Sequence, residues 1–327
     1  MRLGIAGCGR IVERGYVPAA LAAPGVEIVA FADPDQERLG RCRELWGEDG
    51  ADAVGFADAA ALLEREEVDL LVVAAPLEHH LPLAEEAAAA GVRCLVEKPP
   101  APDLVAAQRL AALAPEPLLA FNRRFLQGAE LRDAVPAEGW LELDLELRFK
   151  REGWGAHEVR DEALLDAGIH LVDLACHLSG ADPIAVRRAR IEPERAELEL
   201  ELSRGRARIR CATDRRYREL VAIRDRSGKV LGRSALGSVR GRLAAAAGQP
   251  QPLVLSLQRQ LEAVRDLLGG NEGERTHFFP HSGNNYVRAI ATAADGATAM
   301  AVVEAARRSA ALEGAEVTVA PVAEVSV

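Results

Sequence analysis

Short apolar runs alternate with amphipathic stretches through the first 120 residues of the chain. The runs carry little polar alternation, which is typical of strands that are buried on both faces of a parallel sheet. The stretches between them repeat apolar residues at helical spacing. We therefore expect a doubly wound α/β domain over residues 1–121, with strands at 3–6, 27–32, 70–75, 93–96 and 118–121 and helices at 11–23, 36–46, 59–66, 80–90 and 104–113.

The second half of the chain carries strands of another kind. Residues 140–150 alternate strictly between apolar and charged side chains, so this strand buries only one face. Residues 197–202 and 206–211 predict a hairpin with an acidic and a basic arm, whose arginines have cross-strand partners rather than a nucleic-acid ligand. A strand at 218–224 and helices at 254–268 and 289–312 complete the pattern. It predicts an α+β domain over residues 122–327 with a large, mostly antiparallel open sheet.

Composition narrows the classes of partner. The net charge of -10 disfavours nucleic acid or an anionic membrane, because both need a basic face. The five cysteines form no CxxC pair, and we interpret them as reduced core residues of a cytoplasmic protein. The chain begins at once with a strand and contains no apolar run as long as a membrane span, so we expect neither a signal peptide nor a membrane anchor.

A glycine loop follows the first predicted strand and opens the first helix. Gly7 permits the tight turn, and Gly9 lets the backbone approach a pyrophosphate at the helix N-terminus. Val12 occupies the third position of the motif, where glycine or alanine is usual. Asp33, at the end of the second strand, can bind both hydroxyls of the adenosine ribose. Its carboxylate repels a 2′-phosphate, so NAD is favoured over NADP. The nearby Arg38 keeps NADP open as an alternative. The alternative is an Asp33-Pro34 turn without a ligand.

Lys98 stands out because lysine is rare in this chain. Only three of the 40 basic residues are lysines, namely Lys98, Lys150 and Lys229. A chain so rich in arginine keeps lysine where a guanidinium cannot serve, and an ammonium, unlike a guanidinium, can give up a proton. Lys98 is therefore a candidate for chemistry, with a residue retained by chance as the alternative.

A predicted helix near residues 164–179 carries a narrow polar stripe. Asp166, His170, Asp173 and His177 follow one another at steps of four, three and four residues, so we expect them on one helix face. Short carboxylates that alternate with imidazoles suit proton transfer in a cleft. A structural stripe, or a metal site at the two histidines and Asp173, are the alternatives.

These motifs occur in one order that resembles the glucose-fructose oxidoreductase / inositol dehydrogenase / MocA family. The residues concerned are the glycine loop, Asp33, Glu97-Lys98-Pro99, Asn122-Arg123-Arg124-Phe125 and Asp166-x-Gly168-x-His170-x-x-Asp173. The resemblance implies an N-terminal Rossmann domain and a substrate-binding and oligomerisation domain. It also implies that Lys98 contacts the reacting hydroxyl, and that Asp173 and His177 form a proton relay.

The resemblance and chain position imply the remaining site residues. For the cofactor they are Gly7, Gly9, Arg10, Ile11, Asp33, Arg38, Pro76, His80, Glu97 and Asn122. For the substrate they are Lys98, Arg123, Trp154, His157, His170 and Tyr286. A cis Lys98-Pro99 bond is expected in the same turn. The sequence departs from the family pattern at Leu77, where Asn is common, and at Asp161-Glu162-Ala163, where a glycine-rich run is common.

The resemblance therefore implies an NAD(P)-dependent oxidoreductase that acts on a secondary alcohol or ketone of a sugar, cyclitol or related small polar molecule. Three alternatives remain open: transient oxidation as in glycosidase-like relatives, imine reduction, and a catalytically silent dinucleotide sensor that binds a protein partner. One face of the predicted second sheet has no evident covering helices, and such a face is commonly closed by a symmetric partner. We expect a homodimer or a homotetramer, with no metal, nucleic acid or membrane as partner.

Overall fold

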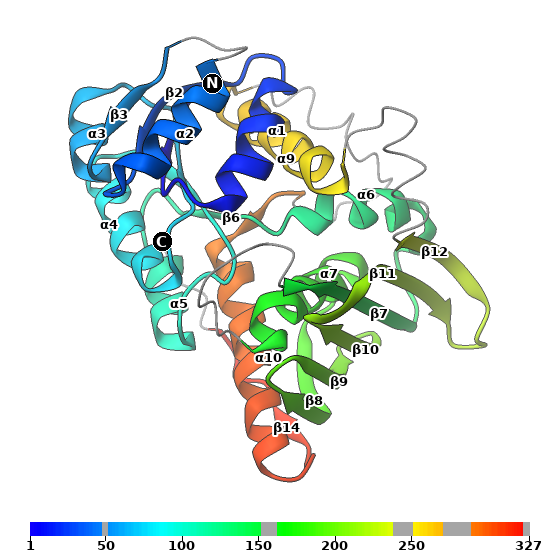
Figure 1. Ribbon diagram of the computed structural model, residues 1–327. Helices are drawn as coiled ribbons and strands as arrows, with labels where there is room; N and C mark the ends of the chain where they lie inside the picture. The colour runs from blue at the N-terminus through cyan, green and yellow to red at the C-terminus, as the bar shows by residue number, and fades with distance from the viewer. Residues whose placement is uncertain (48–51, 152–161, 238–250, 271–288, 323–327) are drawn as a thin grey trace. The chain divides into compact units, whose positions relative to one another are not determined.

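The computed structural model describes residues 1–47, 52–151, 162–237, 251–270 and 289–322 (Figure 1). The chain forms two compact units, and the boundary between them in the first half of the sequence falls between Phe125 and Leu126. The expected boundary lay at residues 121/122, four residues earlier.

The first unit contains a seven-stranded sheet with the order β13-β6-β5-β4-β1-β2-β3. Neighbouring strands from β6 to β3 are parallel, as predicted, and only β13 is antiparallel to its neighbour β6. The strand order with β1 next to β4 is that of a Rossmann fold. The strands are β1 (Arg2–Ala6), β2 (Glu27–Ala32), β3 (Val54–Phe56), β4 (Leu70–Val73), β5 (Arg93–Val96), β6 (Leu118–Leu119) and β13 (Ala291–Thr292).

The helices of the first unit lie close to the predicted ranges. Two of them begin at an aspartate whose side chain accepts a hydrogen bond from a backbone N–H three residues on, namely Asp58 from Ala61 and Asp103 from Ala106, both at 2.8 Å. The elements are η1 (Val12–Tyr16), α1 (Val17–Leu21), α2 (Gln36–Gly47), α3 (Ala59–Arg65), η2 (Leu77–His79), α4 (His80–Ala89), α5 (Leu104–Ala111), η3 (Asn122–Phe125) and α9 (Pro252–Leu268).

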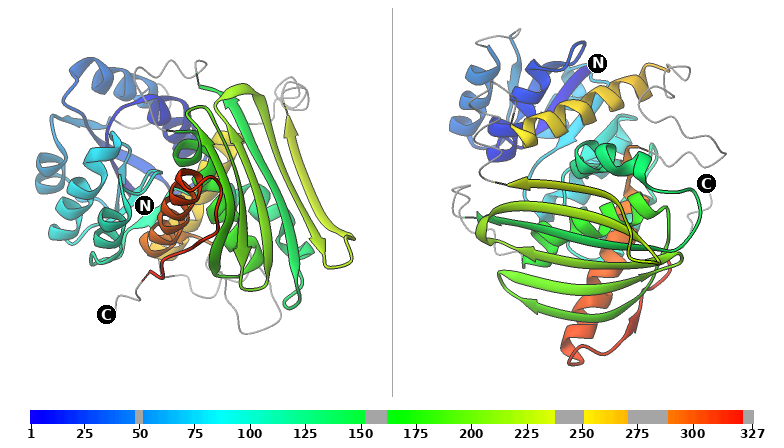
Figure 2. Two further views of the ribbon diagram at one scale, coloured as in Figure 1. Left: turned by 90° about the horizontal axis from the view of Figure 1, so that it is seen from below. Right: turned by 90° about the vertical axis from the view of Figure 1, so that its right-hand side faces the viewer.

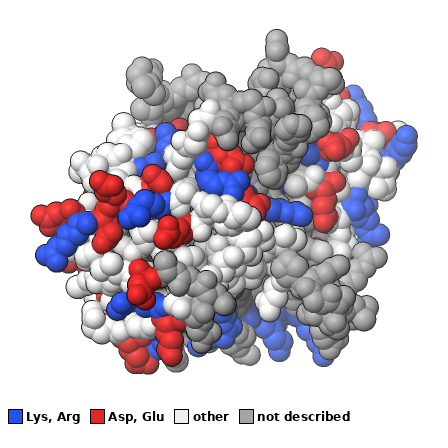
Figure 3. Space-filling model, turned by 90° about the horizontal axis from the view of Figure 1, so that it is seen from above, with Lys and Arg blue, Asp and Glu red and all other residues white. Residues whose placement is uncertain are grey.

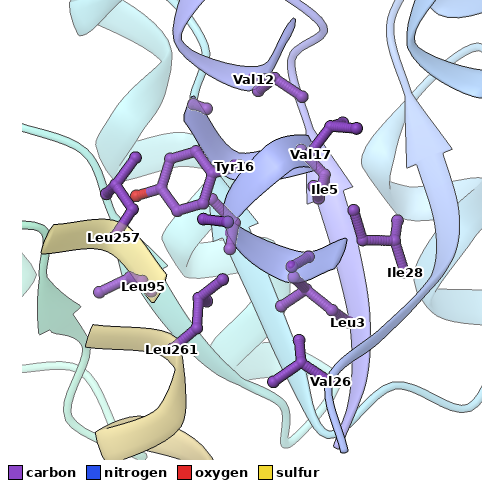
Figure 4. Close-up of a cluster of buried hydrophobic side chains, with 14 of the residues drawn as sticks. Leu3, Ile5, Val12, Tyr16, Val17, Val26, Ile28, Leu95, Leu257 and Leu261 are labelled. Carbon is purple, nitrogen blue, oxygen red and sulfur yellow. The ribbon is translucent and has the colours of Figure 1, made fainter. Parts of the chain in front are cut away.

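The first helix differs from the regular α-helix predicted over 11–23. Residues Val12–Tyr16 form a π-helical turn, η1, before α-helical geometry begins at Val17. Val12 and Tyr16 are both fully buried in the core that α1, α9 and the first sheet enclose (Figure 4). A π turn contains one more residue than an α turn, so hydrophobic periodicity alone does not reveal it.

Helix α9 packs with the first unit, although the sequence analysis assigned residues 122–327 to the second domain. Its apolar face buries Leu257, Leu261 and Val264 in the first unit's core. Gln260 Nε2 donates to the Leu119 carbonyl at 3.1 Å, and Gln258 Nε2 donates to the Ala22 carbonyl at 2.8 Å. The helix therefore covers apolar surface of the Rossmann unit, a long-range pairing that helical periodicity cannot predict.

The second unit contains a seven-stranded, mostly antiparallel sheet with the order β12-β11-β7-β10-β9-β8-β14. The predicted hairpin is present, since β9 and β10 pair antiparallel and leave a two-residue turn at Ser203 and Arg204. The β7–β10 pair is the parallel exception. The strands are β7 (Leu141–Lys150), β8 (Pro183–Glu192), β9 (Arg195–Leu202), β10 (Gly205–Ala212), β11 (Asp214–Asp225), β12 (Val230–Gly237) and β14 (Val317–Thr318).

Helices cover one face of the second sheet. In the right-hand view of Figure 2 the strands lie in front of α7 and of the C-terminal part of α10. Charged side chains of the strands form cross-strand ion pairs such as Arg206–Glu142 at 3.1 Å and Arg210–Asp144 at 2.8 Å. The helical elements of this unit are α6 (Gln127–Leu131), η4 (Arg132–Ala134), η6 (Leu164–Gly168), α7 (Ile169–Ser179) and, from Ala297 onward, α10 (Ala293–Ala311).

Charge and cysteine patterns agree with the sequence analysis. Acidic and basic side chains are interspersed on the face drawn in Figure 3. All five cysteines are free thiols, and four of them are buried. Within the described ranges, no helix has both the length and the apolar character that crossing a bilayer requires.

Candidate functional site

The predicted site residues of the first unit follow the carboxyl ends of its parallel strands. Gly7 comes after β1, Asp33 after β2, Pro76 after β4, Glu97 after β5 and Asn122 after β6. The strand pairing continues up to this edge, where Gly7 N donates to the Ala32 carbonyl at 2.8 Å and Glu97 N donates to the Val73 carbonyl at 2.9 Å. Parallel sheets bind ligands at this edge, beside the point where the strand order reverses.

The glycine loop has little freedom at Gly7 and open space at Gly9. Gly7 has a φ of +95°, and a Cβ added there would lie 2.6 Å from the Ala74 carbonyl oxygen. A Cβ added at Gly9 would meet no atom within 4 Å. The Gly9 carbonyl accepts from Val12 N at 2.9 Å and Glu13 N at 3.1 Å, so the helix starts directly at the loop. This open helix N-terminus fits a dinucleotide pyrophosphate.

Asp33 is joined to the glycine loop by a hydrogen bond. Its Oδ2 accepts from Cys8 N and its Oδ1 from Asp35 N, at 2.7 and 2.8 Å. The side chain is 6% exposed, and each carboxylate oxygen retains a second lone pair that could accept a ribose hydroxyl. Arg38, which kept NADP open in the sequence analysis, is exposed and forms an ion pair with Asp35 at 3.2 Å.

His80 was expected beside the cofactor, yet its ring lies between two backbone carbonyls. Nδ1 is 2.8 Å from the Pro99 oxygen and Nε2 is 2.9 Å from the Ala75 oxygen. Burial lowers the pKa of His80, and the two carbonyls, which favour a doubly protonated ring, oppose that shift. His80 therefore ties the segment before Pro76 to the Lys98-Pro99 turn. Pro76 itself is exposed just before η2.

The Glu97 carboxylate is buried beside Lys98. Its Oε1 accepts from the Tyr16 hydroxyl at 2.8 Å, and its Oε2 accepts from the Lys98 backbone N–H at 3.1 Å. Burial raises the pKa of Glu97, although the charges of Lys98 and Arg123 and the bond from Tyr16 act in the opposite direction. The Lys98 side chain is half-buried, and the Lys98-Pro99 bond is cis, as predicted.

Element η3 contains Asn122 and two arginines with different surroundings. Asn122 is 5% exposed, and its Oδ1 has no hydrogen-bond partner among the described residues, which leaves an acceptor for a ligand at this edge. Arg123 is half-buried, and its charge acts on Glu97. Arg124 is buried and pairs with Asp295 at 3.4 Å, so it anchors the start of α10.

Helix α7 carries the polar residues of the second unit that the sequence singled out. His170, Asp173 and His177 are 7%, 3% and 7% exposed, and their spacing of three and four residues puts them on one helix face. The helix ends at Gly180, whose φ is +59° and whose N–H donates to the Cys176 carbonyl at 2.8 Å. Buried imidazole and carboxylate groups one turn apart can exchange a proton.

Asp166 lies in η6, the π turn that precedes α7, and not in α7 itself. Its carboxylate pairs with Arg151 at 2.9 Å. For Asp166 the shared helix face therefore stays a prediction.

Two buried glutamates, Glu97 and Glu219, have polar partners that the sequence did not reveal. Tyr16, the partner of Glu97, was not singled out, because a tyrosine within an apolar helix carries no signal of a partner. In the second unit, Glu219 is 2% exposed, accepts from Tyr217 at 3.0 Å and also accepts from the Gln127 amide. The sequence signal that could have revealed Glu219 is its position directly before the apolar run at residues 220–223.

The remaining predicted positions are three that the structure does not describe and two at the start of the first helix. Trp154, His157 and Tyr286 lie outside the described residues. Arg10 is exposed and Ile11 is half-buried at the start of the first helix. No group of three or more His, Cys, Asp or Glu side chains within the described part of the chain is placed to hold a metal ion.

Comparisons with known proteins agree with a Rossmann fold in the first unit. Residues 1–119 match the model of the oxidoreductase family with an NAD-binding Rossmann fold. D-apiose dehydrogenase of Paraburkholderia graminis is 32% identical over 186 residues, which are 53% of this chain and 48% of that protein. A dTDP-3,4-didehydro-2,6-dideoxy-alpha-D-glucose 3-reductase of Streptomyces violaceoruber is 33% identical over 194 residues, 56% and 55% of the two chains. The matched part is about half the length of these relatives.

Solved structures extend the likeness in fold to both units. An oxidoreductase from Agrobacterium radiobacter, solved with NAD+, L-tartaric acid and magnesium, has a TM-score of 0.72 at 19% identity and 98% coverage of each chain. A scyllo-inositol dehydrogenase from Lactobacillus casei has a TM-score of 0.72 at 17% identity, also with 98% coverage of each. The predicted combination of folds is confirmed. The family model that matches residues 1–119 is that of glucose-fructose oxidoreductase, inositol dehydrogenase and MocA, the family that the sequence motifs resemble.

Proposed function

We propose that the protein is an NAD-dependent oxidoreductase that transfers hydride between nicotinamide and a secondary alcohol or ketone of a sugar, cyclitol or related small polar molecule. The observation that carries the proposal is the carboxyl edge of the first sheet. There an open glycine loop, a buried carboxylate and a half-buried lysine follow the ends of β1, β2 and β5. The names of the relatives, which act on apiose and on a dTDP-sugar, support the class of substrate.

The cofactor residues follow from the same edge. The backbone from Gly7 to Ile11 would hold the pyrophosphate, and Asp33 would accept the ribose hydroxyls. NAD is the better fit, because a carboxylate at this position repels a 2′-phosphate and the nearby Arg38 already pairs with Asp35. When bound, nicotinamide supplies the hydride acceptor or donor.

Three residues would handle the substrate proton and the charge on its oxygen. As the hydride leaves carbon, a neutral His177 would accept the hydroxyl proton, and Asp173 one turn away would orient the imidazole. The Lys98 ammonium would stabilise the alkoxide charge that develops on oxygen. In the opposite direction, His177 would return the proton. His170 and Arg123 are proposed to bind substrate.

Turnover across a substrate panel tests the proposal. Purified protein is mixed with NAD and, one at a time, polyols, sugars, sugar acids and nucleotide sugars, and the absorbance of NADH is followed. Lys98→Arg is the control for background reduction, and Asp33→Ala is the control for cofactor dependence. NADH formation with at least one substrate supports the enzyme. NAD binding without turnover of any substrate in either direction would instead favour the dinucleotide sensor.

We also propose that the chain assembles as a homodimer or as a tetramer built from dimers. Helices α7 and α10 lie on one face of the second sheet, and the opposite face is broad enough to pair with a symmetric copy. Light scattering at micromolar concentration should then give a multiple of the 35.0 kDa chain mass. A particle of the single-chain mass would contradict the proposal.

A cytoplasmic location is proposed as well. All five cysteines are free thiols, and burial raises the pKa of the Cys94 and Cys211 thiols to about 12, so they suit a reducing compartment and remain protonated. Cell fractionation that recovered the protein outside the cytoplasm would contradict this.

A further inference from the structure

Tyr16 connects the glycine-loop helix to the Lys98 turn. The Tyr16 side chain is fully buried, and its hydroxyl donates to Glu97 Oε1 at 2.8 Å. The other oxygen of that carboxylate accepts from the Lys98 backbone N–H at 3.1 Å. Two hydrogen bonds through one carboxylate therefore join the first helix of the unit to the backbone of Lys98.

The Glu97 carboxylate depends on these donors. Glu97 is 8% exposed, and an ionised carboxylate away from water is unfavourable unless donors and positive charges surround it. Tyr16 and the Lys98 N–H supply the donors, and Lys98 and Arg123 supply the charges. Removal of the Tyr16 hydroxyl leaves Oε1 without this donor, so the carboxylate must rotate or take up a proton. Either change disturbs the bond from Oε2 to the Lys98 backbone.

The same turn is held from its other side by His80. The His80 ring is 2.8 Å from the Pro99 carbonyl and 2.9 Å from the Ala75 carbonyl. Lys98 therefore lies between two fixed points, with Glu97 at its own N–H and His80 at the carbonyl of the next residue. Supporting contacts of this kind hold a reactive side chain at the place where it acts.

Tyr16 is itself held firmly, which makes it a suitable anchor. It ends the π turn Val12–Tyr16, and its ring belongs to the buried cluster that includes Leu95 of β5 and Leu257 of α9 (Figure 4). The same turn begins three residues after Gly9, whose carbonyl accepts the first hydrogen bonds of the helix. The dinucleotide loop and the anchor of Lys98 thus share one short helical segment.

We propose that Tyr16 is a positioning residue that acts through Glu97 to fix the Lys98 backbone relative to the glycine loop. The catalytic consequence rests on the proposed function, whereas the placement of Lys98 does not. Glu97 and His80 then serve the Lys98 turn, and not the cofactor directly as the family resemblance implied.

The scarcity of lysine allows a direct test in the protein without cofactor or substrate. Isotope-labelled lysine gives NMR signals from only three side chains, and the Lys98 signal is assigned by its loss in Lys98→Arg. Tyr16→Phe removes the hydroxyl and keeps the ring. We expect the Lys98 signal to shift and broaden in Tyr16→Phe, while the Lys150 and Lys229 signals stay unchanged.

A matched control comes from the other unit. Tyr217 also donates its hydroxyl to a buried glutamate, Glu219, at 3.0 Å. Tyr217→Phe should therefore leave the Lys98 signal at its wild-type position. Glu97→Gln should disturb the Lys98 signal as Tyr16→Phe does, and the double variant should move it no further than Glu97→Gln alone, because Tyr16 acts through Glu97.

The outcomes separate this inference from the proposed function. An unchanged Lys98 signal in folded Tyr16→Phe, or in Glu97→Gln if Tyr16→Phe does not fold, overturns the positioning role even if the enzyme is active. A shifted Lys98 signal in a protein that turns over no substrate keeps the positioning role and rejects the function. With a substrate in hand, Tyr16→Phe should lower kcat about tenfold to a hundredfold, the scale of a misplaced reacting group, with KM and the Kd for NAD near wild type.

Discussion

The parallel sheet of the first unit and the mostly antiparallel sheet of the second place their charged residues in different positions. Strand β4 is buried along its whole length, and strands β2 and β5 of the same sheet are followed directly by Asp33 and Glu97. Strand β7 instead alternates buried leucines with half-buried charged residues along its length. Charges thus collect at the ends of the first sheet and on one face of the second.

The charged residues of the two sheets differ in the kind of partner they have. On the second sheet Arg208 pairs with Glu197 of β9, and Arg210 pairs with Asp144 of β7, so these arginines have structural partners. At the end of the first sheet, Asp33 and Glu97 accept bonds mainly from backbone N–H groups and one buried hydroxyl, and Asp33 keeps acceptor capacity. Where a charge lies on a sheet therefore says more about function than how many charges a strand carries.

Substitution of Gly7 should cause the largest loss, because it disrupts the loop at the carboxyl edge of the first sheet. In Gly7→Ala the new Cβ would meet the Ala74 carbonyl oxygen at 2.6 Å at a φ of +95°, so backbone strain and overpacking add. We expect a loss of about 3 to 5 kcal/mol in the free energy of unfolding, measured by urea denaturation.

Gly9→Ala is the matched control for Gly7. No atom lies within 4 Å of its added Cβ, so stability should change by less than about 1 kcal/mol. NAD affinity should fall nevertheless, because the methyl group occupies the space left for the pyrophosphate. Equal losses of stability in Gly7→Ala and Gly9→Ala would contradict the close contact at Gly7 and the open space at Gly9.

How far the sequence predicts this fold depends on the range of the interactions. Continuous apolar runs identified the long strands of the first sheet, and strict alternation identified β7 and the β9–β10 hairpin. The short strands β3, β13 and β14 were missed, because two or three residues carry no periodicity. The longer strands β8 and β12 were missed as well. Helix α9 was placed in the wrong unit, since an amphipathic pattern predicts a buried face and not the surface that covers it.

The candidate site shows the same limit. Residues at strand ends, such as Asp33 and Glu97, could be predicted because topology brings parallel strand ends to one edge. The partners of those residues could not, since the bonds from Cys8 N to Asp33 and from Tyr16 to Glu97 span 25 and 81 residues. The two π turns were also unforeseen, and one of them contains Asp166.

The proposed catalytic trio gives the next largest effect. Lys98→Arg keeps the charge but replaces the compact ammonium, and His177→Ala removes the proton acceptor. Each should lower turnover about a hundredfold or more, the scale of acid-base and alkoxide-stabilising effects, whereas NAD affinity should change little. Lys150→Arg is the control and should keep full activity. Near wild-type rates in both Lys98→Arg and His177→Ala would show that these residues are structural. The position of Lys98 after a strand end would then say nothing about catalysis.

Asp33 should give an intermediate effect that concerns the cofactor alone. Asp33→Ala should weaken NAD binding by about 1 to 3 kcal/mol, the value of charge-assisted hydrogen bonds, when measured by calorimetric titration. NADP binding should weaken less or improve, because the repulsion of its 2′-phosphate is removed. Asp35→Ala, which removes the exposed partner of Arg38, serves as the neighbouring control. Tighter binding of NADP than of NAD by the wild type would contradict the role given to Asp33.

The smallest effect is expected on the charged face of the second sheet. Arg208 and Glu197 are 55% and 46% exposed, and exposed pairs of this kind couple by about 0.2 to 1 kcal/mol. A double-mutant cycle with Arg208→Ala and Glu197→Ala, followed by urea denaturation, measures the coupling, and NAD affinity should be unaffected throughout. The coupling should also decline with added salt, because water and ions reach the pair.

A coupling above about 2 kcal/mol, together with a change in the mass from light scattering, would show that the pair is desolvated under a symmetric partner. In that case the comparison would sharpen, because the second sheet would also place its charges for a binding partner, across its face instead of at its ends.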